Sequence, residues 1–535
     1  MKKILQKTML LMGVFFSYFM VMGQSTPPTC VITAPHCNAY FKEGTDIMIR
    51  VYSSDLGGTQ TGGSIKNVEF FKNDIKLGES ATAISYNYTY LWKNVPAGTY
   101  RITAKATDND NIVFTSAGVI ITVGTKAAVS KGLSANKGKY LANVNSNNRT
   151  DFMTYWNGIT SENGCKWGSI EATRDIMNWV DADKSYNLAR DNNLCFRYHV
   201  LAWGSQYPAW ITTLTPADFQ AEMEEYMAAV AKRYPLIDNI DVLNENLYIN
   251  SWDKKEHAPG TPYFRAGLGG PGVTGYDWAI WLFKKARHYF PNAKLVMNEF
   301  EVETGTAALK EMLAVVKVLR DSALIDGFGI QSHYFTLDGT PGTTLQNSLN
   351  AIVKSGLPVY VTELDLKGNP ATEAGQLSTY KALFPILWNH PAVAGITLWG
   401  YVEGSTWSAG TGLLNSTGTE RSAMTWLKSF MAGLPDVGFP FHDTVSITNS
   451  IHQFENGHQI NIYPNPVISG KITIENSTCQ IIESIELIDF QGRIVKTIKL
   501  NKYKAEIEVS NFKKGIYNIR IYTEKSVLCK KIILL

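Results

Sequence analysis

The stretch IDNIDVLNEN, residues 237–246, alternates apolar and polar residues and then ends on Asn244 and Glu245. Such alternation is typical of a β-strand. The segment before it, PADFQAEMEEYMAAVAKRY, residues 216–234, has apolar residues three and four positions apart. This spacing is typical of a helix that packs through one face. A helix followed directly by a strand is one unit of an alternating α/β fold.

The same alternation continues through residues 131–434, where eight short β-like runs are separated by helical stretches. The runs are GKYLANV, GITSEN, CFRYHVLAW, NIDVLNE, KLVMNEF, GFGIQSHY, PVYVTELD and AGITLWG. Eight strands that alternate with helices predict an α/β fold of the (β/α)8 TIM-barrel type for this block.

Most of these runs end in polar or aromatic residues. In a (β/α)8 barrel the carboxyl ends of the strands meet at one face, where active sites are built. The residues at these ends are Glu162, Asn163, His199, Trp203, Asn244, Glu245, Asn298, Glu299, Gln331, His333, Glu363, Asp365 and Trp399. Each alone fits a solvated loop or a packed core position. Together they predict a polar cleft at the barrel mouth.

Two carboxylates in this set, Glu245 and Glu363, end the fourth and seventh runs. Glycoside hydrolysis needs one carboxylic acid to protonate the leaving oxygen and one carboxylate to attack or support the oxocarbenium-like centre. Two such acids about 5 Å apart lead to a covalent intermediate and retained configuration. The pair therefore indicates glycoside hydrolysis.

The motifs at the strand ends are similar in order and spacing to glycoside hydrolase family 10, the endo-β-1,4-xylanases. They are ENGCKW at 162–167, HVLAWGSQYPAW at 199–210, DVLNE at 241–245, GIQSH at 329–333, VTELD at 361–365, and TLWG with the later Trp407. The resemblance covers the whole central block and implies endo cleavage of β-1,4-xylan or xylo-oligosaccharides by double displacement. It implies no cofactor and no metal ion.

The resemblance also implies a role for each matching residue. Glu245 matches the acid/base and Glu363 the nucleophile, and neighbouring charges are expected to keep Glu363 ionised while Glu245 stays protonated. Asn244 matches the amide that binds the sugar 2-hydroxyl, and His333, oriented by Asp365, would hydrogen-bond the nucleophile. The remaining substrate-binding matches are Glu162, Asn163 and Lys166 on the glycone side, His199, Trp203 and Gln206 at the cleavage point, Gln331 beside the acid/base, and Trp399 and Trp407 as aromatic walls.

Two positions depart from the family pattern. Gly204 stands where the family more often has His, so one inner hydrogen-bond partner is missing or replaced. Glu299 and Phe300 stand where Asp and Tyr are usual. Both changes leave the carboxylate pair intact and concern subsite detail more than activity.

Composition excludes several other classes. The chain has 50 Lys plus Arg against 47 Asp plus Glu, a net charge of +3, which indicates neither a nucleic-acid nor an anionic-surface partner. The six Cys are too few for a disulfide scaffold and have no zinc-like spacing with His. Cys30 with Cys37, and Cys479 with Cys529, could pair in an oxidising compartment, whereas Cys165 and Cys195 are expected as free core thiols.

The N-terminal region divides into two parts. Residues 1–23 have Lys2, Lys3 and Lys7 ahead of a short apolar run, which predicts a secretory signal peptide and no transmembrane segment in the mature protein. Residues 28–124 contain short alternating strands and turn clusters, which predict a β-sandwich. It resembles bacterial immunoglobulin-like modules. A spacer role and a carbohydrate-binding face are both open alternatives for it.

Residues 435–459 have no clear periodicity and are interpreted as a linker, followed by a small β domain at 460–535. Its motifs, YPNP at 463–466, DFQGR at 489–493 and GIY at 515–517, resemble the type A sorting domain of the type IX secretion system. This implies contact with that machinery and a protein secreted from, or displayed on, a Gram-negative bacterium. A β-module without a sorting role is the alternative.

Two other function classes remain. A related retaining glycosidase could act on another β-glucan or on a mixed-linkage xylan by the same mechanism with two carboxyl groups. A catalytically silent glycan-binding protein could keep the cleft, although it would not need both Glu245 and Glu363. Reducing-end assays on xylan, cellulose and mannan would separate these classes.

Overall fold

The computed structural model of the chain describes residues 26–56, 63–125, 132–145, 151–250, 255–436, 460–463, 465, 467, 470–476, 481–488, 494–523 and 527–534. The predicted signal peptide, nearly all of the predicted linker, the DFQGR motif and the possible pairing of Cys479 with Cys529 lie outside the described residues and side chains. The chain forms two compact units, residues 1–437 and 438–535. Each is described by itself.

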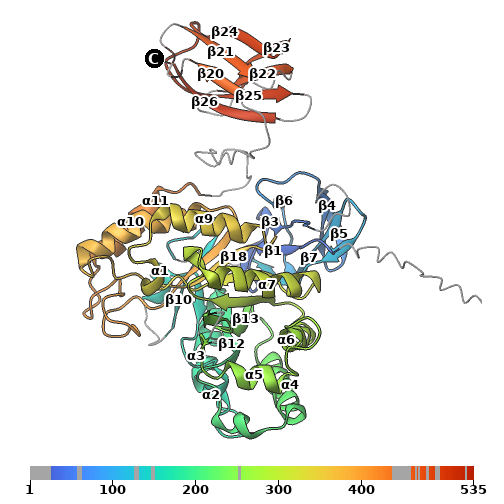
Figure 1. Cartoon of the computed structure of the whole chain (residues 1–535), viewed down its shortest axis with the longest axis vertical. Helices are drawn as coiled ribbons and strands as arrows, with labels where there is room; N and C mark the ends of the chain where they lie inside the picture. Colours follow the sequence, from blue (N-terminus) through green and yellow to red (C-terminus); the bar gives the residue numbers. More distant parts are fainter. Residues whose placement is uncertain are drawn as a thin grey trace, which may run out of the picture. The chain divides into compact units, whose positions relative to one another are not determined.

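The first unit contains a closed barrel of eight parallel strands, which confirms the predicted fold class (Figure 1). Its strands, in order around the barrel, are β10 (Tyr140–Val144), β11 (Gly158–Thr160), β12 (Cys195–Trp203), β13 (Asn239–Asn244), β16 (Lys294–Glu299), β17 (Gly327–Ile330), β18 (Val359–Leu364) and β19 (Val393–Leu398). The barrel closes where β10 pairs with β19. All eight strands coincide with the runs predicted from the sequence.

Helices surround the strands because each buries one apolar face against the barrel. The longer ones are α3 (Val180–Asn192), α4 (Pro216–Arg233), α6 (Asp277–Tyr289), α7 (Ala307–Asp321), α9 (Gly342–Val353), α10 (Glu373–Asn389) and α11 (Ser422–Gly433). Short elements lie in the loops: α1 (Phe152–Tyr155), α2 (Trp167–Ile170), η1 (Ala209–Thr213), β14 (Tyr248–Asn250), β15 (Lys255–Glu256), α5 (Thr261–Gly267), η2 (Val302–Thr304) and α8 (Tyr334–Leu337).

Helix α4 illustrates how the sequence sets these boundaries. The hydroxyl of Thr215 accepts a hydrogen bond from the backbone N–H of Asp218 at 3.3 Å, and Pro216 occupies the first helical turn. Both features favour a helix start. The buried side chains of the helix include Phe219, Met223 and Tyr226, which join the core between the helices and the barrel.

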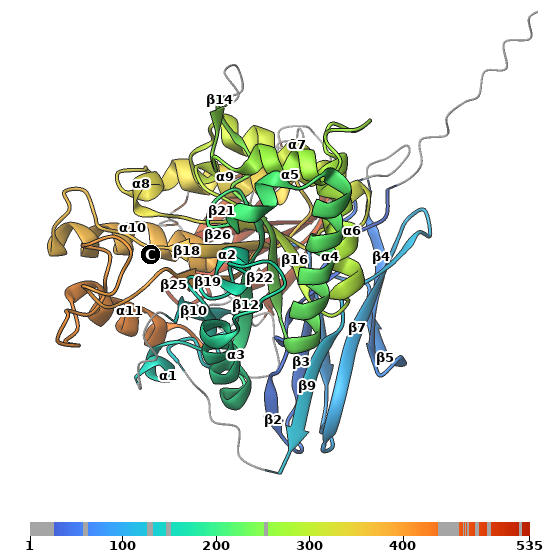
Figure 2. The same ribbon diagram turned by 90° about the horizontal axis from the view of Figure 1, so that it is seen from below.

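The N-terminal part of the first unit is a β-sandwich, as predicted. One sheet has the order β1 (Val31–Ala34), β3 (Ile47–Tyr52), β6 (Asn87–Trp92). The other has the order β2 (Tyr40–Lys42), β9 (Val119–Gly124), β7 (Gly98–Asp108), β4 (Ile65–Lys72), β5 (Ile75–Ser80), and β8 (Val113–Thr115) also pairs with β7. The sandwich lies beside the barrel in both views (Figure 1, Figure 2). Cys30 and Cys37 are free rather than paired, and Cys165 and Cys195 are free and buried, as expected.

The second unit contains two further sheets around a core that includes Ile474, Ile485 and Ile521. One sheet has the order β20 (Ile460–Tyr463), β21 (Lys471–Asn476), β24 (Lys504–Glu508). The other has the order β23 (Ile494–Lys502), β22 (Ile482–Ile488), β25 (Gly515–Thr523), β26 (Val527–Leu534). Across the described residues of the chain, none of the helices has the length and apolar character to span a bilayer.

Candidate active site

Glu245 lies immediately after β13, at the carboxyl end of the barrel. Its backbone φ is 51°, a left-handed conformation that a residue with a side chain rarely adopts. Its N–H donates to the carbonyl oxygen of Asn298 at 3.1 Å. Such a conformation costs on the order of 1–3 kcal/mol and clusters at functional sites. It directs the carboxyl group away from the regular path of the strand.

The carboxyl group of Glu245 is held by two donors, one at the end of β12 and one directly after β17. The indole N–H of Trp203 donates to Oε2 at 2.8 Å, and the amide of Gln331 donates to Oε1 at 2.9 Å. Burial, and then the charge of Glu299, raise the pKa of Glu245 to about 7. A carboxyl group with this pKa keeps a proton near neutral pH and can donate it.

Glu363, the fifth residue of β18, has the opposite electrostatic environment. The amide of Asn298 donates to Oε1 at 2.7 Å, Nε2 of His333 lies 3.4 Å from Oε2, and Arg197 lies 3.8 Å from Oε1. Burial alone would raise the pKa of Glu363, but the hydrogen bond from His333 and the nearby positive charges outweigh it and lower the pKa to about 2. Glu363 is therefore an ionised carboxylate over the whole physiological range.

Amide groups connect the two carboxyl groups. Nδ2 of Asn298 donates to Oδ1 of Asn244 at 2.8 Å as well as to Glu363, and Nε2 of Gln331 lies 3.4 Å from the same Asn244 oxygen. These donors fix the amide of Asn244 with its oxygen toward β16 and β17. Its nitrogen consequently points the other way.

His333 is held in a charged environment by Asp365. Nδ1 of His333 lies 3.1 Å from Oδ2 of Asp365, which also accepts a hydrogen bond from the indole of Trp407. Burial opposes protonation, but the charges of Asp365 and Glu363 prevail and raise the pKa of His333 to about 10. The ring centroid of Trp407 lies 5.1 Å from that of His333, and the Trp407 side chain is half exposed. Trp407 therefore reaches from the buried ion pair to solvent.

A layer of buried charge lies deeper in the barrel. Nδ1 of His199 lies 2.8 Å from Oδ2 of Asp241, and Arg197 forms a bidentate ion pair with the same carboxylate. Arg197 also donates to the carbonyl oxygen of Thr362 at 2.8 Å, next to Glu363. Burial lowers the pKa of His199 despite its bond to Asp241. The ring of Trp399 packs edge-on against His199 at 5.2 Å.

The predicted glycone-side residues lie near the mouth of this site. The ammonium group of Lys166 lies 4.8 Å from the ring centroid of Trp203 and donates to Oδ1 of Asn163 at 2.8 Å. Burial lowers the pKa of Lys166, although the charges of Glu363, Glu162 and Glu245 oppose this shift. These electrostatic couplings connect Glu162 and Lys166 to the carboxylate pair.

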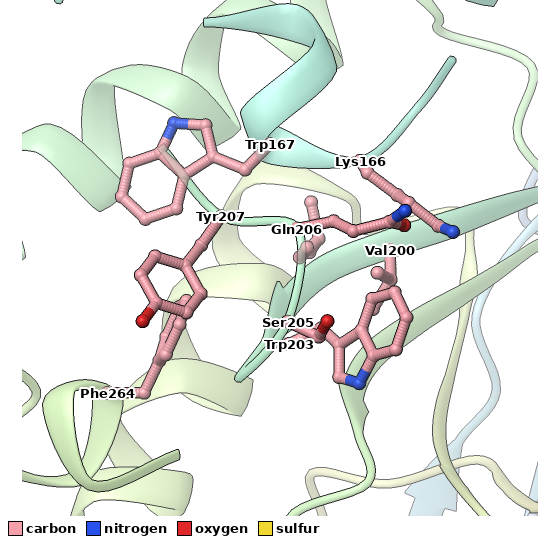
Figure 3. A pocket seen from close by; sticks show the side chains of 9 residues that line it. Lys166, Trp167, Val200, Trp203, Ser205, Gln206, Tyr207 and Phe264 are labelled. Atoms are coloured by element: carbon pink, nitrogen blue, oxygen red, sulfur yellow. The ribbon is translucent and has the colours of Figure 1, made fainter. Parts of the chain in front are cut away.

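A small pocket opens beside Lys166 and Trp203. Figure 3 shows Lys166, Gln206 and Trp203 along one side of it and Trp167, Tyr207 and Phe264 along the other. Gln206 is exposed and has a left-handed backbone, with φ 49°. The structure thus brings together every residue predicted for the site, although Gln206 and Asn163 lie at its exposed edge.

Three residues that were assigned no role from the sequence also contribute to the site. Asn298 contacts Glu363 directly, and Arg197 and Asp241 form the charged layer below it. Arg197 and Asp241 stand inside strands whose residues are almost entirely buried. A pair of opposite charges in adjacent buried strands is a sequence signal that could have identified them.

One group of carboxylates outside the site could be considered for a metal ion. Ligand atoms of Glu171, Asp175 and Glu222 lie within 4.8 Å of one another. Arg174 forms an ion pair with Glu222, and the indole of Trp167 donates to Glu171 at 2.8 Å. Protein donors therefore already hold two of the three carboxylates, those of Glu171 and Glu222.

Comparisons with known proteins address each region of the chain. A family model described as glycosyl hydrolase family 10 matches residues 122–430. Models of a bacterial Ig domain and of a secretion system C-terminal sorting domain match residues 28–104 and 461–535. The sorting domain identifies a protein that is secreted or displayed at the surface of a Gram-negative cell.

Two curated relatives are xylanases. Endo-1,4-beta-xylanase B of Cellvibrio japonicus is 36% identical over 292 residues, which cover 54% of this chain and 45% of that protein. Endo-1,4-beta-xylanase 3 of Hypocrea jecorina is 30% identical over 260 residues, which cover 47% of this chain and 68% of that protein. The chain thus spans a little under half the length of the Cellvibrio relative.

Solved structures agree on the fold. A family 10 protein from Paenibacillus barcinonensis aligns with TM-score 0.50 and 23% identity over 56% of this chain and 96% of that one. A psychrophilic family 10 endo-beta-1,4-xylanase aligns with TM-score 0.50 and 24% identity over 56% and 99% of the two chains. These likenesses support the barrel fold.

Proposed function

The chain belongs to glycosyl hydrolase family 10, and from this premise we propose that it hydrolyses internal bonds of β-1,4-xylan with retention of anomeric configuration. One observation supports the proposal above others. Glu245 and Glu363 lie at one barrel mouth with pKa values shifted in opposite directions, to about 7 and about 2. Two carboxyl groups in different protonation states are what double displacement requires.

In the first step, an oxygen of Glu363 attacks the anomeric carbon and forms an ester bond to the sugar. The glycosidic C–O bond breaks, and the proton of Glu245 moves to the leaving oxygen. The amides of Asn298 and Gln331 need no rearrangement for this step, because they already hold the two carboxyl groups. The chain beyond the cleaved bond then leaves with a new hydroxyl group.

In the second step, the ionised Glu245 takes a proton from water as the water oxygen attacks the anomeric carbon. The ester bond breaks and Glu363 is released as a carboxylate. Two inversions at one carbon restore the β configuration. The charged His333, held by Asp365, stabilises the departing carboxylate through its Nε2 atom, 3.4 Å away.

Substrate contacts are proposed from the geometry around the carboxyl pair. The nitrogen of Asn244 would donate to the 2-hydroxyl, a contact that strengthens in the transition state. Trp399 and the half-exposed Trp407 would wall the sugar at the cleavage point, and Lys166 would bind sugar hydroxyls on the glycone side. Glu162, Asn163, His199, Trp203 and Gln206 complete the proposed binding set.

The three matched regions support a division of labour along the chain. We assign residues 131–434 to catalysis and residues 460–535 to recognition by the type IX secretion machinery, after a signal peptide at 1–23 and a linker at 435–459. The proposed substrate is extracellular xylan or xylo-oligosaccharides.

The test measures reducing ends released from soluble xylan, cellulose and mannan, with Glu363→Ala as the control. Xylan is expected to be cleaved to mixed oligosaccharides, and proton NMR should show the β anomer first. Preferred cleavage of cellulose or mannan would assign another β-glycan as substrate. An early α anomer would exclude the retaining mechanism.

A further inference from the structure

The sandwich contacts the end of the barrel opposite the site, where the strands begin. Its hydrogen bonds reach residues that precede six of the eight strands. They run from Thr29 to Gly356 at 2.8 Å, Cys37 to Asp238 at 2.7 Å, Asn38 to Ala189 at 3.3 Å, Arg50 to Gly138 at 2.9 Å, Asn87 to Pro391 at 3.3 Å and Arg101 to Asn292 at 3.0 Å. Tyr52 of the sandwich packs within the core cluster of the barrel.

A buried ion pair of the barrel accepts a hydrogen bond from the sandwich. Asp238 accepts from Nζ of Lys294 at 2.6 Å and from the backbone N–H of Cys37 at 2.7 Å, and both charged side chains are almost fully buried. Burial opposes ionisation of Asp238, but the charge of Lys294 prevails and lowers its pKa. A buried carboxylate that loses a donor is strongly destabilised. The backbone N–H of Cys37 in the sandwich therefore helps to stabilise the buried charge of Asp238 in the barrel.

The outer surface of the sandwich offers little for a sugar to stack on. In the described part of this domain, Tyr86 is the one aromatic side chain that is largely exposed, and it packs against Tyr52 with ring centroids 5.7 Å apart. Tyr88 and Trp92 are buried, and Tyr40, Phe41, Tyr90, Tyr100 and Phe114 are partly buried, the last four against the core of the domain. This arrangement favours neither a carbohydrate-binding face nor a spacer that holds the barrel at a distance.

We propose that the sandwich is a structural cap of the barrel, which closes the end where the strands begin and unfolds together with it. In this role it stabilises the catalytic block without contacting substrate. The proposal does not depend on which glycan the site cleaves.

Calorimetry of the full chain tests this role. The double variant Asn87→Ala/Arg101→Ala removes two hydrogen bonds between sandwich and barrel. The variant Thr29→Lys places a charge in the buried contact between Thr29 and Gly356. Both should lower the midpoint of a transition shared by sandwich and barrel, by about 2–4 °C for the milder double variant. Lys76→Ala, which removes exposed ion pairs on β5, is the matched control and should leave the midpoint unchanged.

Two results would overturn the proposal. One is a barrel transition whose midpoint does not move in either interface variant. The other is a loss of binding to insoluble xylan in Tyr86→Ala, which would make the sandwich a glycan-binding module.

A separate set of contacts surrounds the turn that follows β13. The carbonyl oxygen of Leu247 accepts from the backbone N–H of His257 at 2.9 Å, and the N–H of Leu247 donates to Oε2 of Glu299 at 3.2 Å. Nδ1 of His257 lies 2.8 Å from Oε1 of the same carboxylate. Arg265 donates to the carbonyl oxygen of Asn246. Residues 245–247 are thus held through their backbone by Glu299 and by the segment 257–265.

Gly204 allows this segment to approach. The N–H of Gly260 donates to the carbonyl oxygen of Gly204 at 2.6 Å, and a Cβ atom at Gly204 would lie 2.3 Å from the nitrogen of Thr261. The hydroxyl of Thr261 lies 3.4 Å from the carbonyl oxygen of Glu245. The space above Gly204 is therefore filled by the segment that holds the Glu245 turn.

We infer that His257 and Glu299 are positioning residues that hold Glu245 in its left-handed conformation. This inference rests on the proposed function, since it assigns the turn a purpose in proton donation. Because Glu299 also contributes negative charge beside Glu245, its replacement should change the proton affinity of Glu245 as well as its position.

Glu299→Gln and His257→Gln, compared on two substrates, test the inference. On xylan, kcat should fall about 10-fold or more, because general acid help is lost. The first-turnover release of phenol from an aryl xyloside with an acidic phenol should stay close to that of the unaltered protein, since that leaving group needs no proton. In Glu299→Gln the basic limb of the pH profile should also move to lower pH, because a negative charge that raises the pKa of Glu245 is removed. The inference would be overturned if the variants lost rate equally on both substrates and the basic limb of the pH profile did not move. Failure of the unaltered protein to cleave xylan would overturn the proposed function instead.

Discussion

His333→Asn should shift the acid limb of the pH profile upward. The pKa of Glu363 is about 2 against an ordinary value of 4.5, a difference worth about 3 kcal/mol in favour of the ionised form. The side chain of His333 supplies a hydrogen bond and a positive charge to that carboxylate, while burial acts in the opposite direction. Loss of one close cation typically changes a carboxyl pKa by about 1–3 units. We therefore expect Glu363 to titrate about two units higher in the variant.

The measurement is kcat/KM for soluble xylan at pH values from about 3 to 9, because this ratio reports pKa values of the free enzyme. Circular dichroism at each pH must show that the variant is folded. His288→Asn is the matched control, since His288 is exposed on α6. The maximum rate of His333→Asn will also fall, but a simple loss of structure would not move the acid limb. Coincident acid limbs in variant and unaltered protein would refute the electrostatic reasoning.

Three further outcomes are expected. Glu363→Ala should be nearly inactive on every substrate, whereas Glu245→Ala should lose about 10²- to 10⁴-fold on xylan. Glu245→Ala should still give a phenol burst from an activated aryl xyloside, and azide should speed the slow phase that follows and yield the β-glycosyl azide. A β-glycosyl azide formed by Glu363→Ala would instead reverse the two roles, because azide that replaces a lost nucleophile gives the α azide. Gly204→Ala should lower the thermal midpoint, because its Cβ would meet the Thr261 nitrogen at 2.3 Å, and an unchanged midpoint would mean that the 257–265 segment can move aside. The pKa of His333 is raised from 6.5 to about 10, so its ion pair should contribute fully to the stability of the folded protein below pH 6.5, and this contribution should be lost as the pH rises through 10. The urea midpoint should therefore fall between these pH values, and an equal fall in His333→Asn would contradict this assignment.

The barrel could be predicted because its signal is local. Each strand, such as the alternating run of β13, is a short β-like segment between helices, and topology then brings the strand ends together. That is why Glu245, Glu363 and His333 could be placed at one mouth from the sequence. The roles assigned to them come from the family resemblance and are predictions for mutagenesis.

The remaining features depend on contacts between distant segments, which leave no local pattern. Nothing near Gly204 in the sequence indicates that Thr261 fills the space beside it. The interface between Cys37 and Asp238 joins residues of two different domains, and neither residue belongs to a periodic motif. The free state of Cys30 and Cys37 likewise follows from where the strands place them.

The hydrogen bond from Thr29 to Gly356 also constrains the order in which the chain can fold. The two residues are 327 positions apart, and the bond can form only after β17 has been added to the chain. Domains generally begin to fold from the N-terminus, so the sandwich can start to form while most of the barrel is still unstructured. Long-range contacts of this kind are slow to form. The early-folding domain then presents a prepared surface on which the starts of successive barrel strands are aligned, so the folding rate of the barrel should depend on a domain that takes no part in its chemistry.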